Sequence, residues 1–152
     1  MKDLEIKAAL QIAKPIDEVF DAIIDPHKMS NYFISESTGR MEEGKILTWK
    51  FPEFDMKFPV EVKKIERPHL IQFEWEGQPE HMLQVDIKLE EKAPEKTLAH
   101  ITEGKMKNDE EGIKWLGRNS GGWANFLACL KAYLEFGINL RKGGYDFMKP
   151  KD

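Results

Sequence analysis

The sequence lacks the features on which several classes of protein depend. It contains one cysteine, Cys129, so no disulfide can form within the chain, and we expect a reducing compartment such as the cytoplasm. No apolar run is long enough to span a bilayer, and charged residues interrupt the first ten positions, which argues against a secretory signal core there. Phosphate-binding glycine loops, dinucleotide fingerprints and nucleophile elbows are also missing. We therefore expect no membrane insertion, no nucleotide site and no cofactor.

Metal and nucleic-acid binding are equally poorly supported. The four histidines lie far apart, and no two of them have the spacing of metal ligands on one helix or hairpin: His27, His69, His81 and His100. Lysine and arginine number 23 against 27 acidic residues, and both signs are mixed along the chain. A basic face for nucleic acid is not predicted, and neither is a metal site.

The length and composition fit one domain. The 152 residues are 41% hydrophobic and 33% charged, which is enough apolar material for a continuous core. We assign residues 1–142 to this domain. The glycine pair at 143–144 predicts the end of its ordered part, so we expect residues 143–152 to form a flexible tail.

Periodicity divides the domain into strands and helices. Residues 4–12 alternate between apolar and polar, which predicts a strand with one buried face. Two short helices are expected next, from Pro15 to residue 24 and over residues 27–33. Residues 35–106 return to period two, with turn signals that divide them into about six strands. An antiparallel sheet with one covered face follows from this pattern.

A long terminal helix provides the cover for that face. Apolar residues at helical spacing extend over residues 109–140, about 45 Å of helix, and Asn108 with Glu111 forms a capping-box pattern at its start. Gly121 and Gly122 interrupt the first half, where we expect a kink or a break. Glycines at this place also let backbone or a ligand approach closely.

Three sequence segments carry a resemblance to a known family. Residues 15–22 (Pro-Ile-Asp-Glu-Val-Phe-Asp-Ala), residues 25–33 and the terminal pattern of residues 122–134 follow its motifs in order. Over residues 4–138 the chain resembles START-like, or birch-pollen-allergen-like, helix-grip proteins. Within the SRPBCC superfamily it is similar to bacterial relatives of the activator of heat-shock-protein-90 ATPase.

The resemblance implies an α+β fold. A curved antiparallel sheet of about six to seven strands, with two short helices, would grip one long C-terminal helix around an apolar cavity. Proteins with this fold include lipid carriers, hormone receptors, polyketide cyclases and co-chaperone domains. The fold therefore leaves the function open, and the site has to be argued from its residues.

Aromatic residues supply a candidate binding site. Each ring could simply fill the core, but rigid rings cannot fill a concave sheet completely, and an apolar enclosure with few polar groups is the usual composition of a small-molecule pocket. The loop at residues 51–58 would be its mouth. The predicted ligand-binding residues are Phe20, Tyr32, Trp49, Phe51, Phe58, Phe73, Trp75, Glu103, Trp123 and Phe126.

Glu103 is the one candidate for chemistry. On the last strand it continues the parity of Ala99 and Ile101, so it would point beneath the terminal helix. There it could act as an acid or base, or hold the polar end of a ligand. The alternative is that the strand end is open to water, or that a bulge reverses the parity.

Three functions remain open at this stage. The sequence favours a non-enzymatic protein that encloses a small apolar or aromatic molecule, such as a lipid. The reason is that no acid, base and nucleophile are predicted to lie together. The second is an enzyme of cyclase or hydratase type, with Glu103 and Tyr32 moving protons on a polyketide-like substrate. The third is a co-chaperone-like domain whose partner is a chaperone or another protein.

Overall fold

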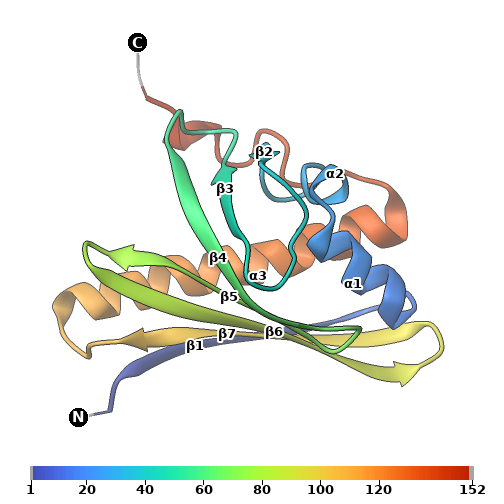
Figure 1. Ribbon diagram of the computed structural model, residues 1–152. Coiled ribbons are helices and arrows are strands. Elements are labelled where there is room, and N and C mark those ends of the chain that lie inside the picture. Colours follow the sequence, from blue (N-terminus) through green and yellow to red (C-terminus); the bar gives the residue numbers. More distant parts are fainter. Residues whose placement is uncertain (1, 151–152) are drawn as a thin grey trace.

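The alternating segments form one antiparallel sheet in the computed structural model, which describes residues 2–150. Within that range the sheet has seven strands in the order β1-β7-β6-β5-β4-β3-β2. Figure 1 shows it as a strongly curved layer with one long helix, α3, lying across it. The strands are β1 (Leu4–Ile12), β2 (Glu36–Ser37), β3 (Ile46–Lys50), β4 (Lys57–Glu66), β5 (Leu70–Gln78), β6 (His81–Ala93) and β7 (Lys96–Met106). The predicted fold is confirmed.

Strand register explains why one face is covered. Val85 of β6 lies between Phe73 of β5 and Glu103 of β7, and the pairing continues this layer across neighbouring strands. All three side chains are buried. Because side chains alternate along each strand, the polar residues between them face the other side of the sheet. The inner face is therefore almost wholly apolar, and Glu103 is an exception on it.

Helix α3 (Glu110–Phe136) runs unbroken, so the predicted kink or break did not produce an interruption of the helix. Its N-cap is Asp109, whose side chain accepts from the Gly112 amide at 2.8 Å, rather than the predicted Asn108. Gly137 ends it with φ +65°, a left-handed conformation that glycine adopts without strain. Each interior glycine costs a helix about 1 kcal/mol, and the apolar face buried against the sheet outweighs that cost.

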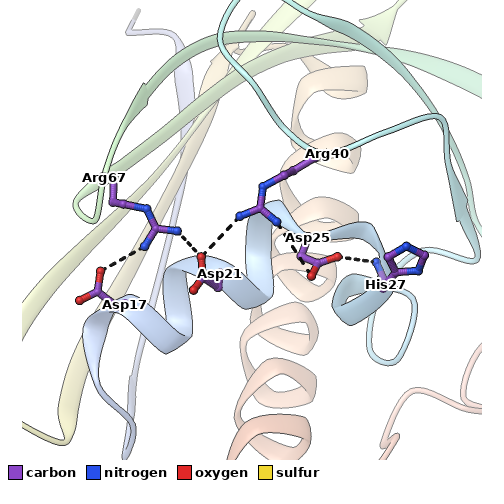
Figure 2. A network of polar contacts seen from close by, with 6 residues as sticks. All are labelled: Asp17, Asp21, Asp25, His27, Arg40 and Arg67. Atoms are coloured by element: carbon purple, nitrogen blue, oxygen red, sulfur yellow. Dashed lines mark hydrogen bonds and ion pairs between the residues drawn. The ribbon is translucent and has the colours of Figure 1, made fainter.

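Two short helices close one end of the sheet. They are α1 (Ile16–Ile24) and α2 (Pro26–Met29), the second of which stops earlier than the predicted residue 33. Figure 2 shows the polar network along them. Arg67, after β4, contacts Asp17 and Asp21, and Arg40, between β2 and β3, lies 3.6 Å from Asp21. These exposed pairs connect α1 to two sheet connections.

The segment after α3 returns toward the sheet. Residues 138–150 form turns and the short 3-10 helix η1 (Asp146–Met148), and Figure 1 shows this red segment passing beside β3 and β4. The flexibility expected of residues 143–152 stays a prediction, and Met1 and residues 151–152 lie outside the described range. No helix within residues 2–150 has both the length and the apolar character needed to cross a membrane.

Candidate functional site

Glu103 lies beneath α3, at the place that strand parity predicted. Its side chain is fully buried, and its two carboxylate oxygens accept from two indole groups. Trp75 of β5 donates to Oε2 at 2.6 Å, and Trp123 of α3 donates to Oε1 at 2.9 Å. The amide of Asn119 lies 3.2 Å from the same Oε1. Three neutral donors thus hold one buried carboxylate and connect β5, β7 and α3.

Aromatic side chains fill the space beneath the middle of α3. Trp49 is only 1% exposed, and its ring centroid lies 5.4 Å from that of Phe73 and 5.9 Å from that of Phe33. Trp123 and Phe126 of α3 complete the cluster with centroids 5.3 Å apart. These edge-to-face contacts are those of a close-packed core. The space that remains lies at the side of this cluster.

That space is a pocket of about 490 Å³, within the usual range of small-molecule sites. It is bounded by α3, the loop after β3, β5 and the segment after α3. Phe54 and Met148 are exposed at its rim, so it opens to solvent. Its lining is Phe33, Phe51, Glu53, Phe54, Trp75, Arg118, Asn119, Gly121, Gly122, Trp123, Asn125, Arg141, Tyr145 and Met148.

The glycine pair of α3 makes room for this pocket. Gly121 and Gly122 both line it, and a Cβ built on either of them would meet no atom of the described residues within 4 Å. Both glycines are exposed, so a larger side chain at either position would occupy free space beside the pocket lining without colliding with the protein. The expectation that glycines let a ligand approach the helix backbone agrees with this geometry.

A buried ion pair holds the rim of the pocket together. The two terminal guanidinium nitrogens of Arg141, Nη1 and Nη2, donate to the carboxylate of Glu53 at 2.8 and 2.9 Å. The same guanidinium lies over the rings of Phe51 and Tyr145, at 5.3 and 4.7 Å from their centroids. Glu53 is 6% exposed, so the pair is shielded from water. It joins the β3–β4 loop to the chain segment that follows α3.

A second pocket of about 510 Å³ adjoins the first and shares Phe33, Glu53 and Arg141 with it. Tyr32 lines this second pocket. Its hydroxyl donates to the Ala22 carbonyl at 2.8 Å, and burial, with Tyr133 nearby, raises the pKa of Tyr32 well above its usual value. Tyr32 is therefore a neutral structural donor here, and it does not line the pocket beside Trp123.

The structure brings only some of the predicted ligand-binding residues to the first pocket. Phe51, Trp75 and Trp123 line it, and the predicted mouth loop contributes Glu53 and Phe54 as well. Glu103 does not line the pocket itself, but it accepts hydrogen bonds from residues that do, including Trp75 and Trp123. The other predicted residues line neither pocket: Phe58 is half-buried and packs against the core, and four lie within the core, namely Phe20, Trp49, Phe73 and Phe126. Their role as ligand contacts stays a prediction.

Sequence reasoning missed the polar part of the lining. Arg118 and Asn125 lie three or four residues from the glycine pair, so helical spacing places all four on one face of α3. That spacing could have identified them. Arg141 follows the helix end, where no periodicity predicts the direction of a side chain, and nothing in the sequence pairs it with Glu53.

Comparison with known proteins places this fold in a family. Residues 13–135 match the model of the family "Activator of Hsp90 ATPase homolog 1-like protein". The protein SSP2350 from Staphylococcus saprophyticus is 31% identical, with a TM-score of 0.80 over 91% of this chain and 96% of that one. No curated protein matches the chain significantly.

Two more distant structures share the fold. The Aha1 dimer from Colwellia psychrerythraea is 18% identical, with a TM-score of 0.76 over 88% of this chain and 98% of that one. DynU16, a putative protein in the dynemicin biosynthetic locus, is 23% identical with a TM-score of 0.78; the match covers 91% of this chain and about half, 49%, of DynU16. The family match covers most of this chain, and the chain belongs to the family of activator of Hsp90 ATPase homolog 1-like proteins.

Proposed function

We propose that this protein binds a small, largely aromatic molecule in the pocket beside Trp75 and Trp123, without transforming it. The observation that carries this proposal is the glycine pair: a helix face left bare at Gly121 and Gly122, opposite aromatic walls. Glycine in a helix costs stability, and the apolar face of α3 packs without help from these positions. Space for a bound ligand is a physical reason for having glycine, which has no side chain, at these two positions.

The polar groups support binding over catalysis. Glu103 has its carboxylate occupied by three donors, and Glu53 is held by Arg141. Both carboxylates thus already have partners within the protein, which favours a structural role for them over proton transfer. These contacts give no support to the cyclase or hydratase alternative, in which Glu103 and Tyr32 would move protons on the substrate.

A matched pair of variants tests the pocket. We expect the neutral fluorescent probe N-phenyl-1-naphthylamine to bind the wild-type protein saturably and to quench tryptophan emission. Gly122→Leu should weaken this binding at least about tenfold, because the leucine side chain occupies the pocket. Gly117→Leu is the control, since Gly117 lies on the same helix, has equally free space and does not line the pocket.

Absence of saturable binding to the wild-type protein contradicts the proposal, and so does equal loss in both leucine variants. The co-chaperone alternative is favoured by the family match over residues 13–135. It has its own test, which is the ATPase rate of Hsp90 with and without this protein. A stimulation that Gly122→Leu leaves unchanged would separate that activity from the pocket.

A further inference from the structure

Resting on the proposed function, we infer that the ligand carries an anionic group, such as a carboxylate, on its aromatic body, and that Arg118 binds this group at the mouth of the pocket. The inference begins from the charges in the lining. Among the lining residues, two arginines face one glutamate: Arg118 and Arg141 against Glu53. One positive charge is therefore left over.

Arg118 supplies that charge. Arg141 is already bound by both oxygens of Glu53 and is covered by two aromatic rings. Arg118 is exposed, and within residues 2–150 none of the ion pairs includes it. A guanidinium with free N–H groups at the edge of an apolar pocket fits a planar carboxylate well.

The neighbouring groups fit the same ligand. Asn119 and Asn125 line the pocket from the same helix. Asn119 donates one N–H to Glu103, which leaves its second N–H and the amide of Asn125 as donors for an anion beside Arg118. The bare backbone of Gly121 and Gly122 lies between them, so a ring could lie along α3 against Trp75 while its charged end meets Arg118. The ring and the charged group of such a ligand would thus contact different residues of the same lining.

Glu103 is the group that argues for the opposite ligand. Its negative charge is buried behind the two indoles, and a cation over those rings would be attracted to them. However, the carboxylate has three hydrogen-bond donors and no exposed surface, so no ligand atom can contact it. Arg118 can be contacted directly, and a direct hydrogen-bonded ion pair dominates over a charge that acts through an aromatic ring.

Three probes with one ring system test the inference: 2-methylnaphthalene, 2-naphthoate and 2-naphthylmethylammonium. We expect 2-naphthoate to bind wild-type protein roughly tenfold more tightly than the neutral probe, and we expect this preference to shrink at high salt. Arg118→Met should abolish the preference, so that 2-naphthoate and 2-methylnaphthalene bind the variant with similar affinities. Lys114→Met is the control, because Lys114 lies one turn away on α3, pairs with Glu110 and Glu111, and does not line the pocket.

The outcomes separate the two proposals. Neutral binding without a preference for the anion, or a preference that survives Arg118→Met, overturns the inference and leaves the proposed function standing. Tightest binding of the ammonium probe overturns it in favour of the charge on Glu103. Binding of none of the three probes overturns the proposed function and the inference together.

Discussion

At the scale of single residues, Glu103 acts through its neighbours. Its two oxygens accept one indole N–H each, so the carboxylate determines the orientation of two rings that line the pocket. Glutamine has only one carbonyl oxygen, and its NH₂ group would face the second indole N–H. We expect Glu103→Gln to lower the free energy of unfolding by about 1–3 kcal/mol, the cost of an unsatisfied buried donor.

The same substitution should shift the tryptophan emission spectrum and weaken probe binding, because one ring loses its anchor. Glu76→Gln is the control: Glu76 is exposed and neighbours Trp75 on β5. Denaturant unfolding followed by fluorescence measures both variants. A Glu103→Gln protein with wild-type stability, spectrum and probe affinity would contradict the positioning role.

Tyr32 supplies a hydrogen-bond donor to a backbone carbonyl at the C-terminal end of α1. The Ala22 carbonyl would ordinarily accept from residue 26, but Pro26 has no N–H, and the Tyr32 hydroxyl takes its place at 2.8 Å. We expect Tyr32→Phe to lower the free energy of unfolding by about 2 kcal/mol at neutral pH, since a buried carbonyl loses its donor.

The pH dependence of this loss follows from the raised pKa of Tyr32. The folded state favours the neutral phenol, so its contribution to stability is complete below the unfolded pKa of about 10 and falls as pH rises above that value. The gap between wild type and Tyr32→Phe should therefore narrow above about pH 10. Urea unfolding at pH 7 and pH 10.5 measures it, and a constant gap would contradict the assignment.

Prediction of single residues from the sequence succeeded where the alternation of a strand defined the direction in which a side chain points. Strand parity was sufficient to place Glu103 beneath α3, because alternate side chains share a face. It could not indicate that the donors would come from Trp75 and Trp123, which lie on other elements. The burial predicted from alternation also could not distinguish a ring that lines a pocket, such as Trp75, from a ring that fills the core, such as Phe73.

At the scale of elements, α3 combines a packed face with a face kept bare. Since helical alanine is about 0.5–1 kcal/mol more stable than glycine, Gly121→Ala and Gly117→Ala should both raise the free energy of unfolding by about that amount. Only Gly121→Ala should also weaken probe binding, several-fold, because only Gly121 lines the pocket. Unfolding and fluorescence titrations of the two variants check this. Equal affinities would remove the glycine pair from the site.

The segment after α3 depends on one ion pair for its position. Removing the charge of Glu53 leaves the Arg141 guanidinium without its partner in a site where its side chain is only 11% exposed. We expect Glu53→Gln to increase amide hydrogen exchange in residues 138–150 at least about tenfold and to leave β6 and β7 unchanged. Glu36→Gln is the control, since the Glu36–Lys57 pair is exposed. Unchanged exchange in residues 138–150 would contradict the role of the pair.

The boundaries of helices and strands were predictable from the sequence only where tertiary packing does not override local signals such as alternation or glycine. Alternation predicted about six strands after residue 35, and that number is found in β2 to β7. The glycines of α3 predicted a kink or a break, and there is no break, because the apolar face that α3 buries keeps the helix continuous. The residues after Gly137 carry no period, so the sequence could not predict that they return to cover the pocket.

At the scale of the whole molecule, the order of motifs predicted the fold family, whereas the position of the pocket depends on how a terminal segment, a loop and a helix meet. Binding of the proposed ligand would therefore be a property of the folded state alone. A ligand at 100 times its dissociation constant should stabilise the protein by about 2.7 kcal/mol. For a domain of 152 residues, this corresponds to a rise in melting temperature of roughly 5–10 °C.

Thermal unfolding with and without N-phenyl-1-naphthylamine measures this linkage. Because Gly122→Leu weakens probe binding at least about tenfold, its melting temperature should rise by at most about half as much as that of the wild type, while Gly117→Leu should respond as the wild type does. An equal rise in both variants would place the probe elsewhere, most simply in the second pocket beside Tyr32. A larger rise in melting temperature in the proteins with an unfilled pocket would show that the probe stabilises the fold by binding in the space beside the glycine pair of α3.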